Sequence, residues 1–502
     1  MFDSFLQGVE LALRFDTMLY MSGGLFLGMF VGALPGFTTV MAMAILLPIS
    51  FFLDPLLGIP FLLGVYKGGI YGGSIPAILV SMPGTGAAVA TTFDGPALTK
   101  KGQGRKALEM ALYASVSGDL TSDIFTIIAI GPIAAVALLL GPPELAAILL
   151  LALIVISATS SGVFVKGLLM LAAGLFLAMI GQDPIGALSR FSFGIPEIEA
   201  GIPLLPMLIG LFALPEIFVN IEKKASAVID EKSLKVSGEP LRWHEFKASI
   251  RTIARSTMIG TSIGMIPGVG QVVAAFMGYA AAKSSSPTPE KYGKGELDGV
   301  AAAEAANNAV NGPTLVPLLT LGIPGDNLTV ILGGAFIAQG MRPGPQLMQE
   351  QGPLVFAILV AMVIANILFL GIGKLCIPFF AKVVTIRKSF LLPLTLVFAF
   401  AGTWVFRGQP SDLAILVIFG AIGYLCKKLH FDVTPMAMGF ILGPILEYSY
   451  GQSVILAQGE LLKFIFIDRP ITAVILVASP VVTFLMWRRS KRLQAEYNAG
   501  SE

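Results

Sequence analysis

Long apolar stretches, interrupted at intervals by glycine and proline, make up most of the sequence. A helix needs about 20 apolar residues to cross the hydrocarbon core of a bilayer. Stretches that approach or exceed this length lie near residues 17–50, 55–80, 108–140, 142–160, 163–181, 201–221, 251–282, 301–340, 353–382, 389–406, 411–426, 432–447 and 453–486. The pattern predicts an all-α polytopic membrane protein with about 11 to 14 transmembrane or half-spanning helices.

The same apolar motifs occur twice, in the same order and with nearly the same spacing. Gly32-Ala-Leu-Pro-Gly36 returns as Gly264-Met-Ile-Pro-Gly268, and Ser81-Met-Pro-Gly-Thr85 returns as Gly322-Ile-Pro-Gly-Asp326. Each Pro-Gly pair breaks a helix inside an apolar stretch and frees backbone groups that no water can satisfy there. Broken helices at matching places in two halves of a chain are typical of a transporter binding site. The sequence therefore predicts two repeats with re-entrant Pro-Gly hairpins.

A polar segment separates the two copies and divides the chain into four parts. These are a first membrane repeat at 1–221, a polar linker at 222–255, a second membrane repeat at 256–468, and a last helix with a basic tail at 469–502. Because positively charged loops stay on the cytoplasmic side, the lysines and arginines of the linker and the tail place both there.

Charge in the loops also indicates how the two repeats insert. Lys100, Lys101, Arg105 and Lys106 follow the first hairpin, whereas the matching stretch after the second contains only Arg342. This difference favours opposite orientations, which is the inverted-repeat architecture with its binding site where the repeats meet. A parallel duplication with uneven loops is the alternative.

Composition excludes several classes of function. Hydrophobic residues make up 55% of the chain and charged residues 13%, with a net charge of only +2, so nothing indicates a nucleic-acid partner. The two cysteines lack metal-type spacing, and His244 and His430 both lie in polar segments. Since a nucleotide-binding Gly-rich loop is also missing, we expect no enzyme activity and no cofactor, and we expect the energy to come from an ion gradient or from another subunit.

The first hairpin is a candidate anion site. Pro83 removes a backbone donor, and Gly84 allows a sharp reversal of the chain. A half-helix that starts after this pair would point free N–H groups at a carboxylate, and Ser81 and Thr85 would add hydroxyl donors. The alternative is a kinked helix with glycine-mediated packing and no ligand.

The second hairpin repeats this skeleton with different chemistry. Gly325 takes the place of the first hairpin's glycine, and Asp326 and Asn327 follow it. An acid at membrane depth suggests a coupling cation, Na⁺ or H⁺. Asp326 could instead be a helix N-cap, and the two roles are compatible.

Other polar residues near the breaks complete the predicted site. Asn307 and Asn308 are candidate substrate ligands and Asn311 a candidate ion ligand, with interhelical amide bonds as the alternative. Lys67 is a candidate counter-charge for an anionic substrate, or a side chain that reaches an interface. Thr38 and Thr39 are candidate ion ligands after the first Pro-Gly break, where packing is the alternative.

Three further acids are expected to be peripheral. Asp94 precedes Gly-Pro and a basic loop, so a role in a turn is expected. Asp119 and Asp123 are likewise interpreted as lying away from the site.

Taken together, these motifs resemble the large membrane subunit of the tripartite tricarboxylate transporter family over nearly the whole chain. The resemblance rests on Gly-x-Leu-Pro-Gly at 32–36, Tyr-Gly-Gly-Ser-Ile-x-Ala-Ile-Leu at 71–79, Pro83-Gly84, Phe93-Asp-Gly-Pro, Asn307-Asn308 and Pro317-Leu-Leu-Thr-Leu-Gly-Ile-Pro-Gly325. It implies a permease of the bacterial inner membrane with two partners, a small four-span membrane subunit and a periplasmic solute-binding protein. It also implies uptake of a di- or tricarboxylate driven by sodium or protons.

The sequence therefore favours a cation-coupled carboxylate transporter with one site between its repeats. A passive anion or cation channel, which needs a continuous polar pore, is one alternative. A transporter of a non-carboxylate solute is another, and an intramembrane enzyme is disfavoured because the chain has no catalytic set.

Overall fold

The computed structural model describes residues 2–160, 163–186, 188–222, 238–386 and 388–499, and in this part of the chain the protein is almost entirely helical. Residues 223–237 of the predicted linker lie outside the described residues, as do 500–502 of the predicted tail. The only sheet in the described part is an antiparallel pair, β1 (Gly181–Gln182) with β2 (Ser189–Arg190). The predicted all-α class is confirmed.

The first half of the chain contains eleven α-helices and one short 3₁₀ turn in the described residues. They are α1 (Phe2–Ala12), α2 (Phe15–Gly32), α3 (Thr39–Ser50), α4 (Pro55–Val80), α5 (Ala88–Thr91), α6 (Gly95–Lys100), α7 (Gly104–Ala137), α8 (Pro142–Ser160), α9 (Phe164–Ala178), η1 (Pro196–Ile198), α10 (Leu204–Phe212) and α11 (Leu214–Glu222).

The second half repeats the alternation of long and broken helices. Its elements are α12 (Trp243–Ala248), α13 (Ile250–Gly264), α14 (Gly270–Ser284), η3 (Pro289–Lys291), α15 (Leu297–Asn308), α16 (Leu315–Leu321), α17 (Asn327–Ala338), α18 (Leu347–Glu350), α19 (Gly352–Val383), α20 (Lys388–Arg407), α21 (Pro410–Lys428), α22 (Thr434–Leu456), α23 (Leu461–Lys463), η4 (Phe464–Asp468) and α24 (Pro470–Ala499).

Seven of the helical segments in the described residues are long and apolar enough to cross a membrane. Shorter apolar helices, among them α3, α9 and α17, are too short for a full crossing. They correspond to the half-spanning pieces that Gly and Pro predict. The protein is therefore an all-α polytopic membrane protein.

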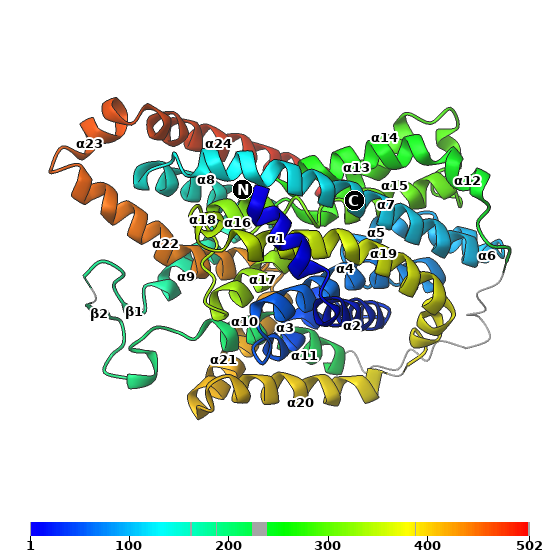
Figure 1. Cartoon of the computed structure of the whole chain (residues 1–502), viewed down its shortest axis with the longest axis horizontal. Helices are drawn as coiled ribbons and strands as arrows, with labels where there is room; N and C mark the ends of the chain where they lie inside the picture. The colour runs from blue at the N-terminus through cyan, green and yellow to red at the C-terminus, as the bar shows by residue number, and fades with distance from the viewer. Residues whose placement is uncertain (1, 161–162, 187, 223–237, 387, 500–502) are drawn as a thin grey trace.

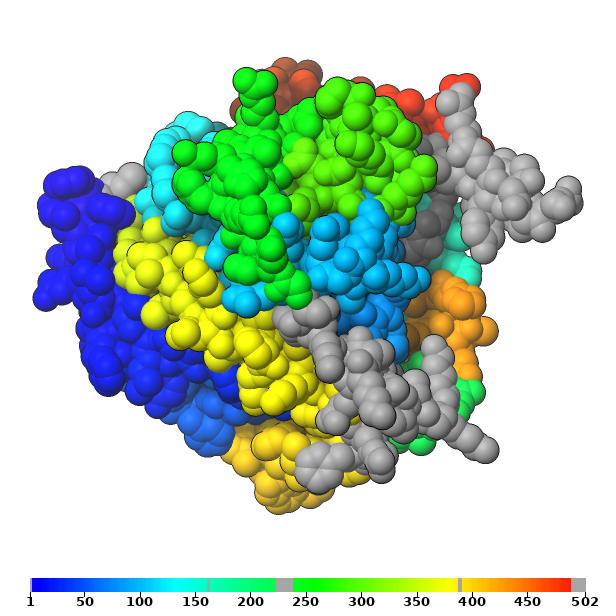
Figure 2. Space-filling view, turned by 90° about the vertical axis from the view of Figure 1, so that its right-hand side faces the viewer, coloured from blue at the N-terminus to red at the C-terminus, as the bar shows by residue number. Residues whose placement is uncertain are grey.

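Interior helices are flanked by helices with large exposed apolar faces. Figure 1 shows α24 beside α8 along one edge of the molecule and α20 along the opposite edge. Only 11% of the apolar window of α24 is buried, whereas α4 is buried along nearly its whole length. Figure 2 shows α19, in yellow, packed against the dark blue N-terminal helices, so the two halves of the chain share one packed body.

The most extensive helix contact in the described chain joins α2 to α4 through glycines spaced four residues apart. Gly24, Gly28 and Gly32 on α2 face α4, and a Cβ at Gly28 would lie 2.3 Å from the carbonyl oxygen of Val65. On α4, a Cβ at Gly68 would lie 2.2 Å from the carbonyl oxygen of Leu25. Small residues at this spacing allow two backbones to approach closely where the lipid supplies no hydrophobic drive.

The second copy of the repeat also packs two helices together through glycines spaced four residues apart. Gly260 and Gly264 on α13 take the positions of Gly28 and Gly32, and a Cβ at Gly260 would lie 2.2 Å from the carbonyl oxygen of Ala306 on α15. In each half, the helix before the first Pro-Gly motif thus packs through glycines against the helix that leads toward the second. Similar sequence produces similar packing in both copies.

Substituting alanine for Gly28 should destabilise the protein, because its Cβ would meet backbone rather than a movable side chain. We expect a loss of about 1 to 3 kcal/mol, the usual range for an overpacked core. The measurement is the thermal unfolding midpoint of the purified protein in detergent. Gly23→Ala on the same helix is the control, since nothing lies within 4 Å of its Cβ position. Equal midpoints for the two variants would contradict the packing described.

Candidate functional site

A cavity of about 520 Å³ lies where the broken helices of both halves meet. Its wall includes Thr38, Thr39 and Thr85 from the first half and Gln271, Asp326 and Asn327 from the second. Four other segments contribute: α10 and α11 through Leu211, Phe212, Pro215 and Glu216, and α21 and the start of α22 through Gly423, Lys427, Asp432 and Thr434. The volume is that of a typical small-molecule site.

Two helices begin at this wall directly after the first Pro-Gly motif of each half. Residues Thr38 and Thr39 start α3, and Gly270 and Gln271 start α14. Thr38 accepts a hydrogen bond from the N–H of Met41 at 3.2 Å, while no side chain caps α14. The first N–H groups of a helix have no partner within the helix and carry its positive dipole end. Both helix ends are therefore suited to an anion in the cavity.

Two other helices begin at the cavity but are already capped by acids. Asp326 accepts hydrogen bonds from the N–H and hydroxyl of Thr329 at the start of α17, both at 2.8 Å. Asp432 accepts from the N–H of Thr434 at the start of α22, at 2.9 Å. These carboxylates satisfy the local N–H groups, so α17 and α22 are less available to a ligand than α3 and α14.

Within the second motif of each half, the Pro-Gly pair does not line the cavity, whereas Thr85 and Asp326 directly after it do. The two Pro-Gly pairs therefore form a supporting layer next to the cavity wall. Gly84 donates its N–H to the carbonyl of Gly73 at 3.0 Å, and a Cβ there would lie 2.5 Å from the carbonyl oxygen of Gly32. In the second half Gly268 donates its N–H to the carbonyl of Gly325 at 2.7 Å. The two motifs of each half are therefore packed against one another.

Several predicted substrate ligands do not reach the cavity wall. Pro83, Gly84 and Gly325 are in the supporting layer, and Ser81 is an exposed residue with a positive φ of 57° at the end of α4. Of the predicted residues, the cavity brings together Thr38, Thr39, Thr85, Asp326 and Asn327.

A chain of hydrogen bonds leads from the cavity wall into the interior. Tyr66 donates its hydroxyl proton to Asp326 Oδ2 at 3.0 Å and accepts a hydrogen bond from Gln271 Nε2 at 2.7 Å. Gln271 also donates to Asn311 Oδ1 at 3.1 Å, and Asn311 Nδ2 donates to Asp119 Oδ1 at 3.2 Å. Because Tyr66 comes from the first half and Asp326, Gln271 and Asn311 from the second, the chain joins the two copies.

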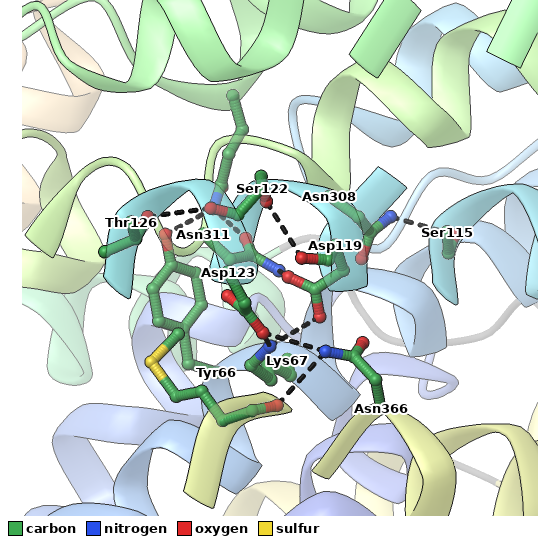
Figure 3. Close-up of polar contacts among 12 residues, drawn as sticks. Tyr66, Lys67, Ser115, Asp119, Ser122, Asp123, Thr126, Asn308, Asn311 and Asn366 are labelled. Carbon is green, nitrogen blue, oxygen red and sulfur yellow. Dashed lines mark hydrogen bonds and ion pairs between the residues drawn. The ribbon is translucent and has the colours of Figure 1, made fainter. Parts of the chain in front are cut away.

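Lys67 ends this chain, and its surroundings correct the sequence interpretation. Its ammonium lies 2.7 Å from Asp119 Oδ2 and 2.5 Å from Asp123 Oδ2, and all three side chains are buried (Figure 3). The expectation that Asp119 and Asp123 are peripheral was wrong, because both lie on the inner face of α7. Lys67 does not line the cavity, and it neither reaches an interface nor stands alone.

The predicted asparagines Asn307 and Asn308 lie beside a second buried acid. Glu304 accepts hydrogen bonds from Ser74 at 2.6 Å, from Ser115 at 3.2 Å and from Thr91. Asn308 donates to Ser115 at 2.9 Å, whereas neither amide atom of Asn307 has a hydrogen-bond partner in the described part of the chain. Neither asparagine lines the cavity.

Lys427 is a cavity residue for which the sequence analysis predicted no role in binding. It lines the wall and forms an ion pair with Glu216. The other charged residues of the wall are Asp326 and Asp432, so the cavity carries three carboxylates and one ammonium. No short-range pattern marks Lys427, because it follows the second hairpin by about 100 residues and reaches the site only through folding.

Asp94 makes more contacts than the predicted turn role requires. Its carboxylate accepts hydrogen bonds from the N–H groups of Gly293, Gly295 and Glu296, at 2.8 to 2.9 Å, and from the hydroxyl of Tyr279 at 2.9 Å. Asp94 thereby holds a loop of the second half against the first.

Removing the hydroxyl of Tyr66 should loosen the junction between the halves. Tyr66→Phe removes the buried donor to Asp326 Oδ2 and one of the two partners of Gln271 Nε2, which keeps its bond to Asn311. The expected loss is about 1 to 3 kcal/mol in the free energy of unfolding. Denaturant unfolding of the purified protein measures it. Tyr71→Phe on the same helix is the matched control, since that buried hydroxyl makes only a long 3.4 Å bond to a carbonyl. A larger effect at Tyr71 than at Tyr66 would contradict the network.

Comparison with known proteins adds three findings. The model of the "Tripartite tricarboxylate transporter TctA family" matches residues 18–438. The "Uncharacterized 52.8 kDa protein in TAR-I ttuC' 3'region" of Agrobacterium vitis is 35% identical over 488 residues, which cover 97% of this chain and 96% of that protein. The "Uncharacterized protein in TAR-II ttuC' 3'region" of the same organism is 34% identical over 238 residues, or 47% of this chain and 98% of that protein. No solved structure matches.

Proposed function

This chain belongs to the TctA family of tripartite tricarboxylate transporters, and we propose that it imports a di- or tricarboxylate, or a related organic acid, by secondary active transport coupled to Na⁺ or H⁺. In this proposal it works in the bacterial inner membrane with a small four-span membrane subunit. It receives its substrate from a periplasmic solute-binding protein.

One observation carries the proposal: the uncapped start of α14 and the start of α3 border the same cavity. Each helix follows a Pro-Gly break, and each comes from a different copy of the duplicated unit. Backbone N–H groups at a helix start bind carboxylates well because they combine directional donors with a positive dipole end. Two such ends on one cavity match a substrate with two or more carboxylates.

Hydroxyl and cationic side chains complete the proposed substrate site. Thr39 is buried, and its hydroxyl has no hydrogen-bond partner in the described part of the chain, although the residue lines the cavity. Thr38, Thr85 and Asn327 add polar atoms to the same wall, and Lys427 adds a positive charge that a substrate carboxylate would share with Glu216. Gly84 and Gly325 act through the backbone that supports these residues.

The charge of the wall favours entry of the anion together with a cation. Three carboxylates and one ammonium line the cavity, so a multivalent anion alone would add to an excess of negative charge. A cation that binds with the substrate removes part of this repulsion, which is strong in a low-dielectric site. The wall thus supports symport over a passive anion channel.

The substitution Thr39→Val tests the proposed substrate site directly. The substitution keeps the shape of the side chain and breaks no hydrogen bond within the described residues, so stability should not fall. A hydrogen bond to a charged ligand is worth about 1.5 to 3 kcal/mol, so KM for carboxylate uptake should rise roughly tenfold or more. The assay is radiolabelled citrate and dicarboxylate uptake by proteoliposomes containing the chain with its partner subunits.

Thr403→Val is the control, because that hydroxyl is buried on α20 and bonds only to the carbonyl of Ala399, at 2.8 Å. An unchanged KM in Thr39→Val would remove the cavity from the substrate path. Electrical recording separates the rival function, since ohmic current without saturable uptake would identify a channel.

A further inference from the structure

The ion cluster of Lys67, Asp119 and Asp123 is a fully buried charged group that the substrate site leaves unused. The side chains of Lys67 and Asp119 have no exposed surface, and that of Asp123 is 1% exposed. Lys67 comes from α4, whereas Asp119 and Asp123 lie one helical turn apart on α7. One face of α7 therefore presents two carboxylates to a single ammonium.

The cluster has an excess negative charge. Asn366 on α19 donates to Asp123 Oδ2 at 2.8 Å, and Asn311, after α15, donates to Asp119 Oδ1, but both amides are neutral. Two other titratable groups adjoin the cluster: Tyr66 precedes Lys67 on α4, and Glu304 on α15 accepts a hydrogen bond from Ser115, one turn before Asp119 on α7. The first is a neutral phenol, and the second is an acid bonded to three hydroxyls, so neither supplies positive charge. An unbalanced charge in the interior of a membrane protein is costly and calls for a compensating cation or proton.

One oxygen of the cluster is left open. Asp123 Oδ1 is buried and has no hydrogen-bond partner among the described residues, although the other three carboxylate oxygens of the cluster are bonded. It lies against the backbone of Gly312, where a Cβ would come within 2.6 Å of it and within 2.8 Å of Thr126 Oγ1. Thr126 already donates its own proton to the carbonyl of Ser122 at 2.8 Å. A buried polar atom without a hydrogen-bond partner is rare in folded proteins, and it indicates that a proton or a ligand binds there in another state of the protein.

A proton fits this oxygen better than a metal ion does. Lys67 already occupies the space between the two acids and bonds to both of them, so a metal ion would have to compete with the ammonium for the same oxygens. Hard cations also need several oxygen ligands, and the crowding by Gly312 leaves little room beside Oδ1. Two carboxylates that share one site favour the state in which one of them is protonated.

We propose that the Lys67–Asp119–Asp123 cluster carries the coupling proton of transport, with Asp123 as the proton-binding residue. The inference rests on the proposed function and specifies its coupling ion. An O–H bond forms at Asp123 as one breaks in a hydronium ion on one side of the membrane, and the reverse transfer to water occurs on the other side. Because the cluster is sealed from solvent here, each transfer takes place in a different conformation.

The hydrogen-bond chain through Asn311, Gln271 and Tyr66 links the cluster to the cavity. Amide groups do not relay protons, so this chain is not a proton path. The chain instead couples the positions of its residues. A substrate that moves Asp326 or the start of α14 also moves Asn311, the hydrogen-bond partner of Asp119. Substrate occupancy and protonation thereby affect each other, which is the requirement for symport.

Asp123→Asn tests the proposal because an amide imitates the protonated acid permanently. In proteoliposomes with the partner subunits, the variant should still exchange external for internal substrate, since exchange needs no net proton movement. It should lose accumulation driven by an imposed pH gradient, so that its internal-to-external ratio falls to unity while wild type accumulates. Asp412→Asn is the matched control, because Asp412 is also buried and paired, to Arg407, but lies outside the cluster.

The possible outcomes separate the two proposals. Exchange without proton-driven accumulation in Asp123→Asn supports the inference. Accumulation equal to wild type overturns it, as does wild-type accumulation that follows a sodium gradient and ignores pH, and both results leave the proposed function intact. Wild type that shows neither saturable exchange nor uptake overturns the proposed function. Should Asp123→Asn fail to insert, Asp119→Asn decides, since it also balances the charge and should lose the same proton-driven accumulation.

Discussion

A backbone amide inside a membrane has no water to bind, and this constraint determines how the chain is broken. Each Pro-Gly motif frees backbone amide groups, and in each half one of these N–H groups donates to a nearby backbone carbonyl. Gly84 bonds to Gly73 in the first half, and Gly268 bonds to Gly325 in the second. These bonds fix the backbone at the breaks. The N–H groups that remain at the starts of α3 and α14 are left for the cavity, where a bound anion is the natural partner.

Glycine packing makes this arrangement possible. With the backbones of α2 and α4 in near contact, and α13 equally close to α15, the broken ends of both halves are brought to one place. A side chain at any of these glycines would separate the helices and pull the hairpins out of register with one another. The site is therefore a product of close helix packing as much as of its own polar residues. That also explains why so many of the glycines lie outside the cavity.

Local sequence identified the residues beside the breaks that line the cavity, and their roles as ligands stay predictions. Thr38, Thr39, Thr85, Asp326 and Asn327 all follow a Pro-Gly motif within a few residues, and the cavity gathers all five. The periodicity of α7 carried no comparable signal. Asp119 and Asp123 stand among apolar and hydroxyl residues with no motif beside them, and only the approach of α4 shows that they face Lys67. Lys427 could not be predicted as a cavity residue for the same reason, because its partner Glu216 is about 200 residues away in sequence.

Asp326 illustrates why capping and transport need not be alternatives. One carboxylate oxygen caps α17 through Thr329, and the other accepts the hydroxyl of Tyr66 from the opposite half. The first contact stabilises a helix start at the cavity, and the second connects that helix start to the chain leading to Lys67. If Asp326 were only a cap, a bond to its own helix would be enough. The additional bond to Tyr66 means that any movement of α17 against α4 must break or stretch a buried hydrogen bond. The bond therefore ties the two halves together at the cavity and resists small displacements of α17 against α4.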